Sequence, residues 1–197
     1  MQSIRKQLIG NYVAIALFTV LLLESMFIIV ISQYYLGGVE RVLVNHAETA
    51  ANFYNRYADK GDIYTKSNYI FENMDVEENA LVEVLDLSGQ IVIDSTGSAS
   101  SEMVTTWDFI QALDGRMESW KGRSELGEFI IAVSAPIYDE NNIVGVLRYV
   151  SSLEPTYAII VRYVLAAALL GAAVIGVAFV FGRMMSRRIL VPIQELV

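Results

Sequence analysis

The residues best suited to bind a ligand are concentrated in one short segment, 116–123, which contains Arg116, Trp120, Lys121 and Arg123. Cationic side chains donate charge-assisted hydrogen bonds to carboxylates and phosphates, and a neighbouring indole adds an aromatic surface. The segment therefore predicts a site for a carboxylate or phosphate ligand. The alternative is a solvated basic loop that balances the charge of an acidic domain and binds nothing.

Three polar residues on nearby elements are expected to complete this pocket. They are Ser134 and Tyr138 on the strand that follows the segment, and Asp94 at the end of an earlier hairpin. With the basic segment they form the predicted ligand-binding set.

No active-site pattern is present elsewhere in the chain. Glycine-rich phosphate loops and clustered metal ligands are missing, and Ser95 beside Asp94 has no histidine close to it in sequence. The absence of cysteine excludes disulfides, thiolate catalysis and thiol metal sites. We therefore predict no catalytic residue, no metal and no cofactor in this chain.

Two other polar features have an ordinary structural interpretation. His46 is the only histidine and lies on an apolar helical stripe, which predicts a packed or dimer-facing side chain, with pH sensing as the alternative. The acidic run 75–78 is predicted to be solvated, with divalent-cation binding as the alternative.

Two long apolar runs, 9–31 and 158–181, bracket these features. Each exceeds the roughly 20 residues that cross a bilayer as a helix, and a helix is favoured because lipid offers no partner for backbone polar groups. The sequence therefore predicts a two-pass protein of the plasma membrane. We predict five segments: a cytoplasmic N-terminus (1–8), a first span (9–32), an extracellular domain (33–157), a second span (158–182) and a cytoplasmic linker (183–197).

Charge patterning sets this orientation. Basic residues precede the first span and follow the second, so both termini are predicted to be cytoplasmic; they are Arg5, Lys6, Arg183, Arg187 and Arg188. The middle segment holds 20 negative against 8 positive charges, a net charge of −12. Such acidity suits a soluble exported domain and argues against nucleic acid as a partner.

Glu24 and Arg162 are the charged residues within the predicted spans. A carboxylate in lipid is costly, so Glu24 should be protonated or paired, and Arg162 is the predicted partner. This intramembrane polar pair is read either as a lock that biases signalling or as a satisfied contact within or between chains. In the second span, the small residues Ala168, Ala172 and Gly176 at steps of four predict close helix packing in a homodimer.

Periodicity predicts an α+β domain between the spans. A long helix over 39–57 and a shorter one over 67–79 are followed by strands at 81–87 and 90–94. A helix beginning at Ser101 or Thr105 and running to about 113 comes next. Residues 119–123 are predicted as a strand or an irregular lead-in, and strands follow at 129–136 and 143–151. This order predicts an antiparallel sheet.

The two hairpins carry a resemblance to a known family. Residues 85–95 (LDLSGQIVIDS) resemble the first hairpin of extracellular Cache domains, which are PAS-like sensor modules, and 135–138 (APIY) with 142–147 (NIVGVL) resemble their closing hairpin. The resemblance implies a ligand lying against the sheet beneath the basic segment.

Residues 186–196 (SRRILVPIQEL) resemble the start of a HAMP linker, with Pro192 and Glu195 in its first helix. Together the resemblances imply the front end of a homodimeric bacterial sensor histidine kinase that detects a small molecule or protein. A kinase domain outside this chain would use ATP and pass phosphate to a response regulator. The alternatives are a membrane-anchored domain that docks a protein partner, or the front end of a chemotaxis receptor or diguanylate cyclase.

Overall fold

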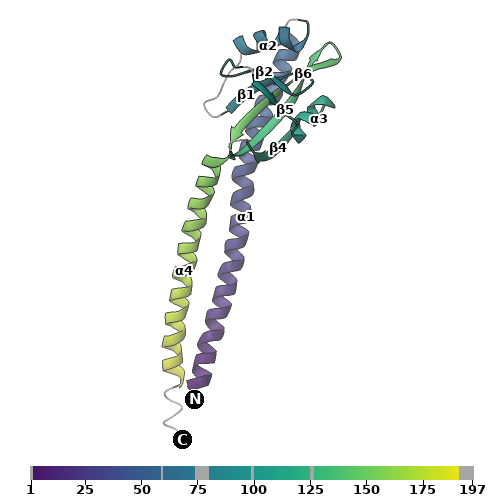
Figure 1. Cartoon of the computed structure of the whole chain (residues 1–197). Coiled ribbons are helices and arrows are strands. Elements are labelled where there is room, and N and C mark those ends of the chain that lie inside the picture. The colour runs from purple at the N-terminus through teal and green to yellow at the C-terminus, as the bar shows by residue number, and fades with distance from the viewer. Residues whose placement is uncertain (1, 59, 74–79, 99, 125–126, 191–197) are drawn as a thin grey trace. The chain divides into compact units, whose positions relative to one another are not determined.

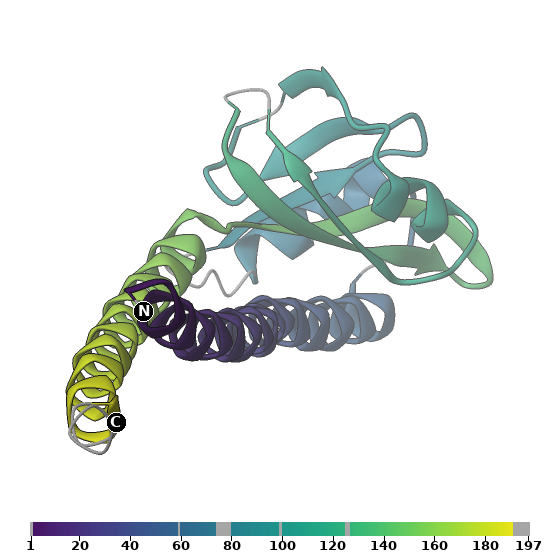
Figure 2. The same ribbon diagram turned by 90° about the horizontal axis from the view of Figure 1, so that it is seen from below.

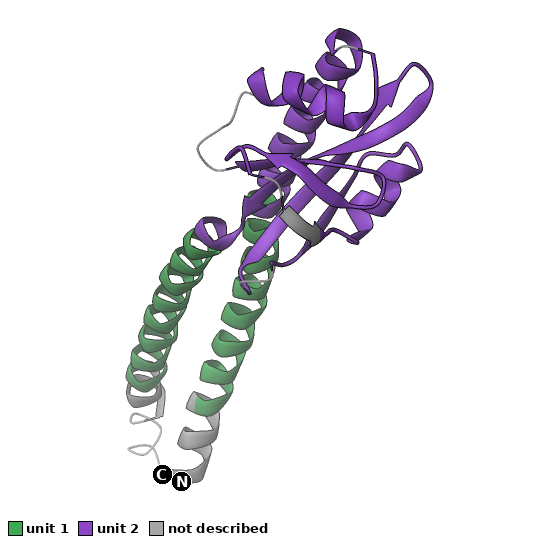
Figure 3. Ribbon diagram, turned by 45° about the horizontal axis from the view of Figure 1, so that its top comes forward, with its two compact units in different colours: residues 1–35, 157–197 green, residues 36–156 purple. Residues whose placement is uncertain are grey.

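The structure, a computed structural model, describes residues 2–58, 60–73, 80–98, 100–124 and 127–190. Figure 1 shows its secondary-structure elements in chain order. The chain divides into two compact units, which Figure 3 colours separately. Unit 1 comprises residues 1–35 and 157–197, and unit 2 comprises residues 36–156.

Two long helices contain the apolar runs. α1 (Gln2–Tyr57) belongs first to unit 1 and then to unit 2, and α4 (Glu154–Leu190) forms the rest of the described part of unit 1. By length and composition both are able to cross a membrane. α1 is unbroken through Gly37 and Gly38, so the predicted first span and the predicted helix over 39–57 form one helix.

Unit 2 is built around one antiparallel sheet of six strands in the order β3-β2-β1-β6-β5-β4. The predicted α+β class is therefore confirmed. The strands are β1 (Ala80–Leu85), β2 (Gln90–Asp94), β3 (Ser100–Met103), β4 (Glu118–Arg123), β5 (Phe129–Asp139) and β6 (Asn142–Ser152). The two short helices of the unit are α2 (Ile63–Glu72) and α3 (Trp107–Leu113).

The sheet has a helix on each face because strand side chains alternate between faces. α1 buries an apolar stripe at steps of three and four, made of Leu43, Ala47, Ala51 and Tyr54, and Figure 2 shows this helix running along one face. α3 packs on the other face, where Phe109 joins Leu85, Ile91, Val104 and Val146 in a buried cluster.

Two predicted helix boundaries are wrong for local reasons. α2 begins at Ile63 rather than at 67, because the Asp62 carboxylate caps it by accepting the Thr65 N–H at 2.9 Å. The helix predicted to begin at Ser101 or Thr105 begins at Trp107, close to the second alternative, and residues 100–103 instead pair with β2 as an edge strand. Residues 74–79, including the acidic run 75–78, lie outside the described residues.

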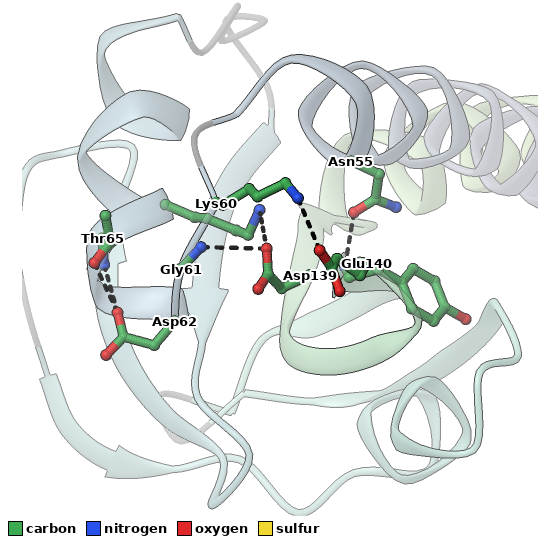
Figure 4. A network of polar contacts seen from close by, with 9 residues as sticks. Asn55, Lys60, Gly61, Asp62, Thr65, Asp139 and Glu140 are labelled. Atoms are coloured by element: carbon green, nitrogen blue, oxygen red, sulfur yellow. Dashed lines mark hydrogen bonds and ion pairs between the residues drawn. The ribbon is translucent and has the colours of Figure 1, made fainter.

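Polar contacts fasten the end of α1 and the start of α2 to the β5–β6 hairpin (Figure 4). Lys60 Nζ lies 2.7 Å from Glu140 Oε1, and the Gly61 N–H donates to Asp139 Oδ1 at 3.2 Å. Asn55 accepts the Tyr138 N–H at 2.8 Å and donates to the Pro136 carbonyl at 3.3 Å. One amide thus satisfies two backbone groups of β5.

Replacing Asn55 with Ala should therefore destabilise unit 2 by about 1–3 kcal/mol, since both backbone groups lose their partner. Asn45→Ala on the exposed side of the same helix is the matched control, because it changes helix propensity equally. Thermal unfolding of the full chain in lipid nanodiscs, followed by near-ultraviolet circular dichroism, measures the difference. Equal melting temperatures for the two variants would contradict the role of Asn55.

Candidate ligand-binding site

A cavity of about 630 Å³ lies on the α3 face of the sheet. Its base consists of alternate residues of β1, β6 and β5, and its sides include the lead-in to α3, Trp120 of β4 and the loop before β5. The apolar lining comprises Leu81, Met103, Val104, Ile130 and Val150. The charged lining comprises Glu83, Arg123, Glu128 and Arg148.

Strand register assembles a polar row across the base. Glu83 of β1 pairs with Asp94 of β2 on one side and with Arg148 of β6 on the other. Arg148 pairs in turn with Ser134 of β5, which pairs with Glu118 of β4. Directly paired residues point to the same face, so five polar residues cross an otherwise apolar sheet in one line.

Arg148 is the centre of this row. Its Nη1 lies 2.8 Å from Glu83 Oε2 and its Nε lies 2.9 Å from Asp108 Oδ2, which comes from α3. Asp108 also accepts the Ser134 hydroxyl at 2.7 Å. The side chains of Arg148, Glu83 and Asp108 are 7%, 9% and 0% exposed, so one buried guanidinium is shared by two buried carboxylates.

The electrostatic environment keeps Arg148 charged. Burial lowers the pKa of its guanidinium, but the carboxylates of Asp108 and Glu83 raise it more, so its pKa is raised overall. Asp108 Oδ1, by contrast, is buried and has no hydrogen-bond partner among the described residues.

Trp120 forms one wall of the cavity, and Gly122 permits its position. The indole lies over Gly122, where a Cβ atom would overlap the ring. Arg123 stands at the rim, with its guanidinium carbon 4.2 Å from the centre of the Phe129 ring and Nη1 donating to the Gly127 carbonyl at 3.4 Å.

The structure brings together only part of the predicted ligand-binding set. Trp120 and Arg123 line the cavity, and Ser134 lies beneath it as a partner of Asp108. Arg116 instead contacts Gln111 and Asp114 on the far side of α3.

Lys121, Tyr138 and Asp94 do not line the cavity either. Alternation along β4 turns Lys121 toward α1. Tyr138 lies at the hairpin end of β5, where its N–H donates to Asn55. Asp94 closes a turn by accepting hydrogen bonds from the Thr96 hydroxyl and from the N–H groups of Ser98 and Thr96; although burial raises its pKa, these bonds lower it overall.

Glu83, Arg148 and Asp108 were missed by the sequence reasoning. A usable signal exists for Glu83 and Arg148, because each lies on the inward side of an apolar strand. Glu83 shares its side of β1 with Leu81 and Leu85, and Arg148 shares its side of β6 with Val146 and Val150. A charge in phase with core residues is buried, and a buried charge is paired or functional.

Glu40 of α1 contacts the face of β4 that lies opposite the cavity. Its carboxylate accepts hydrogen bonds from the Ser119 hydroxyl and from Lys121 Nζ, the latter at 2.6 Å. These bonds, from Lys121 first and then Ser119, lower the pKa of Glu40. One strand thus contacts α1 with Ser119 and Lys121 and the cavity with Trp120.

In unit 1, Glu24 lies against α4 at Gly171, which has no side chain to exclude it. Glu24 Oε1 is buried without a hydrogen-bond partner in the described part of the chain. The Tyr35 hydroxyl donates to the Tyr163 hydroxyl at 3.3 Å, so Arg162 lies near the level of Tyr35. Arg162 precedes Gly171, the position that Glu24 contacts, by nine residues, or about 13 Å of helix rise. Within one chain the predicted Glu24–Arg162 pair is not brought together.

The three small residues predicted to pack the second span are exposed in this chain. Ala168, Ala172 and Gly176 are exposed on α4, and the position that packs on α1 is Gly171. His46 lies between two shallow hollows along α1 and is partly buried. Pro192 and Glu195 of the predicted HAMP start lie outside the described residues.

Replacing Arg148 with Met should destabilise unit 2 by about 3–5 kcal/mol, because two buried carboxylates then face each other without a cation. Arg116→Met, which removes a guanidinium whose side chain is 60% exposed, should change stability by less than about 1 kcal/mol. Melting temperatures of the two variants in nanodiscs provide the comparison. An Arg148→Met protein as stable as the control would show that the cluster does not support the fold.

No family model matches the sequence, and no curated protein sequence matches it. Several solved structures match the fold. The ligand-binding domain of the Campylobacter jejuni chemoreceptor Tlp3, in complex with 4-methylisoleucine, is 15% identical with a TM-score of 0.52; the match covers 71% of this chain and 61% of that one.

Two further matches have TM-scores below 0.5. The ligand-binding domain of the Pseudomonas aeruginosa amino acid chemoreceptor PctC, in complex with GABA, is 20% identical with a TM-score of 0.48, covering 68% of this chain and 62% of that one. The sensor domain of the Vibrio cholerae histidine kinase DctB is 16% identical with a TM-score of 0.34, covering 59% and 43%. The chain spans about three fifths of the length of the chemoreceptor domains. The likeness to the Tlp3 domain shows that this chain shares the fold of that domain.

Proposed function

We propose that this chain is the sensory and membrane-spanning part of a bacterial receptor of the sensor histidine kinase kind. In this proposal unit 2 lies outside the plasma membrane and binds a small molecule, and the apolar helices of unit 1 carry the signal inward. The observation that carries the proposal is the cavity of about 630 Å³, with its paired charges and its aromatic wall. Drug-sized ligands occupy cavities of about this size.

The position of the cavity supports a ligand-binding role. It lies on the sheet face opposite α1, and the Tlp3 domain of the same fold is solved with a small apolar amino acid. An apolar lining with a few fixed polar groups is typical of small-molecule sites.

β4 offers a route from the cavity to the membrane. It is an edge strand whose neighbour in the described sheet is β5, so a shift of β4 breaks fewer backbone hydrogen bonds than a shift of a central strand. A ligand against Trp120 would displace β4, and Glu40 would pass the displacement to α1, which continues without a break into the apolar segment. Signalling in this way requires that the ligand bind two states of the domain unequally.

On the cytoplasmic side, the proposal places a HAMP linker, a homodimer and an ATP-using histidine kinase that phosphorylates a response regulator. Chemotaxis receptors and diguanylate cyclases share this front end and are the alternative outputs. The coding sequence downstream of residue 197 tests this assignment. A histidine-containing dimerisation helix followed by an ATP-binding domain is expected, and a GGDEF-type or methylated coiled-coil continuation would replace it.

A docking domain for a protein partner is the second candidate function. Three large apolar residues are exposed in the part of α1 that belongs to unit 2: Val42 at 48%, Phe53 at 41% and Tyr57 at 56%. Such a row on a helix suits a protein contact, and a second copy of the chain is one possible occupant. The open cavity on the other face favours the sensor.

Removing the Glu40 carboxylate should lower stability by about 0.5–1 kcal/mol at pH 7, because its partner Lys121 is partly exposed and the pair is screened by solvent. The pKa of Glu40 is lower in the folded protein than its ordinary value of 4.5. The contact therefore stabilises the fold above that pH, and its contribution is lost as the pH falls through the lower, folded pKa.

The difference in melting temperature between the wild type and Glu40→Gln should accordingly shrink below about pH 4.5. Glu48→Gln, an exposed position on the same helix, serves as the control. A difference that is the same at pH 7 and in acid would show that the charged contact contributes nothing.

Ligand binding in the cavity is tested by a thermal-shift screen of the full chain in nanodiscs against amino acids, organic acids, amines and short peptides. At least one class should raise the melting temperature of the wild type. Ile130→Trp, which fills the cavity, should abolish that rise, whereas Leu87→Trp on an exposed hairpin should not. No response from any class, or a response that Ile130→Trp leaves intact, would overturn the small-molecule proposal.

A further inference from the structure

We propose that Ser152 is a positioning residue that links the cavity to α4: its hydroxyl belongs to the cavity wall and also accepts the first backbone N–H group of that helix. This inference rests on the proposed function, since it assumes that the cavity on the α3 face takes a small ligand. It adds a route by which an occupied cavity acts on the second apolar helix, beside the route through β4 to α1.

The first support is the course of β6 along the cavity. Arg148, Val150 and Ser152 alternate along this strand, and all three line the cavity. Ser152 is the last residue of β6, and α4 begins two residues later at Glu154. One row of cavity-lining side chains therefore ends at the start of α4, which continues unbroken through the apolar run 158–181.

The second support is the hydrogen bond between Ser152 and α4. The Ser152 hydroxyl oxygen accepts the Glu154 N–H at 3.3 Å. The first backbone N–H groups of a helix have no partner within the helix, and the next residue, Pro155, has no N–H to donate. Ser152 thus supplies the acceptor for the N–H group that begins α4.

Leu153, the residue between Ser152 and Glu154, is held firmly. Its side chain is 1% exposed, and its N–H donates to the Phe129 carbonyl at 2.8 Å. The Phe129 ring in turn contacts the Arg123 guanidinium of the cavity rim, 4.2 Å from the ring centre. The junction of β6 and α4 is therefore short and fixed, so a change in the Glu154 hydrogen bond acts on the first turn of α4 instead of being absorbed in a loop.

An occupant of the cavity changes the surroundings of the Ser152 hydroxyl. This side chain is partly exposed and its bond to Glu154 is long, so water competes with the Glu154 N–H. A ligand that packs against Val150 and Ser152 excludes that water. A hydroxyl removed from water needs a protein partner, so the bond to Glu154 is strengthened and the first turn of α4 is tightened. A hydroxyl donates with its O–H and accepts with its lone pairs, so a bond donated to the ligand does not displace Glu154.

A tethered occupant tests this link without knowledge of the natural ligand. Leu81 lines the cavity, is 36% exposed and pairs with Val150 of β6. Because the chain has no cysteine, Leu81→Cys introduces its only thiol, which is converted to a methyl or a butyl disulfide with the alkyl methanethiosulfonate. The methyl adduct restores approximately the volume of leucine, whereas the butyl adduct adds hydrocarbon to the cavity beside Ser152.

The full chain in nanodiscs, with isotope-labelled glutamate, reports on the Glu154 amide by nuclear magnetic resonance, and Glu154→Gln identifies the signal. Exchange of this amide with solvent should be about two- to tenfold slower with the butyl adduct than with the methyl adduct, the factor that corresponds to one ordinary hydrogen bond. Ile130→Trp, which fills the cavity from β5 without a label, should slow the exchange likewise.

Variants of Ser152 decide whether its hydroxyl carries the effect. Ser152→Ala should abolish the difference between the two adducts, and Ser152→Thr, which keeps a hydroxyl, should retain it. A merely structural role of Ser152 would change the exchange rate equally with either adduct. Ser124→Ala is the matched control, because Ser124 also lines the cavity and accepts a backbone N–H, that of Glu128, at 3.3 Å. This control should leave the difference between the adducts unchanged.

Exchange that neither the butyl adduct nor Ile130→Trp slows, or a difference between the adducts that persists in Ser152→Ala, would overturn the link through Ser152. The broader proposal of a small-molecule sensor fails on a different result, the absence of any compound whose effect Ile130→Trp removes. The tethered chain needs no ligand to bind, so the two failures are distinguishable.

Discussion

The guanidinium of Arg148, shared between Glu83 and Asp108, is the interaction on which unit 2 depends. It joins the two central strands to α3, and it does so on the face of the sheet where the cavity opens. A buried ion pair of this kind contributes little net stability compared with an apolar core, yet it is strongly destabilising to break. Its presence fixes the register of β1 against β6 and the position of α3, and it leaves the base of the cavity polar where the neighbouring rows are apolar.

The remainder of the domain supports that arrangement from the other face. α1 buries a narrow stripe against the sheet and contributes two polar contacts, Glu40 to β4 and Asn55 to β5. These contacts lie four helical turns apart, so the helix is fastened near both ends of its length in unit 2. β4 thus contacts the cavity with Trp120 and α1 with Ser119 and Lys121.

Much of the fold could be predicted from the sequence because local signals agreed with the tertiary structure. Ser88-Gly89 marked the first hairpin, and alternation along 143–151 marked β6 correctly to within a residue or so. The edge strand β3 was not predicted, because its pairing with β2 is short and irregular. The site was predicted only in part: a cluster of basic residues in sequence suggested one pocket, but alternation along β4 sends Trp120 and Lys121 to opposite faces. The charges that do line the base come from strands far apart in sequence, Glu83 and Arg148, and only the register brings them together.

The two adjacent glycines of α1 have a mechanical consequence. Gly37 and Gly38 are helical and lie next to the boundary between the two units, three and two residues before Glu40. Relative to alanine, each glycine lowers helix stability by about 1 kcal/mol. The helix therefore bends most easily at Gly37 and Gly38. A displacement or rotation of α1 at Glu40 would be absorbed in part by bending at these glycines, and the rest would move the apolar segment of the helix. In the proposed sensor, the stiffness of these two residues would set how much of a displacement at Glu40 reaches the apolar part of α1.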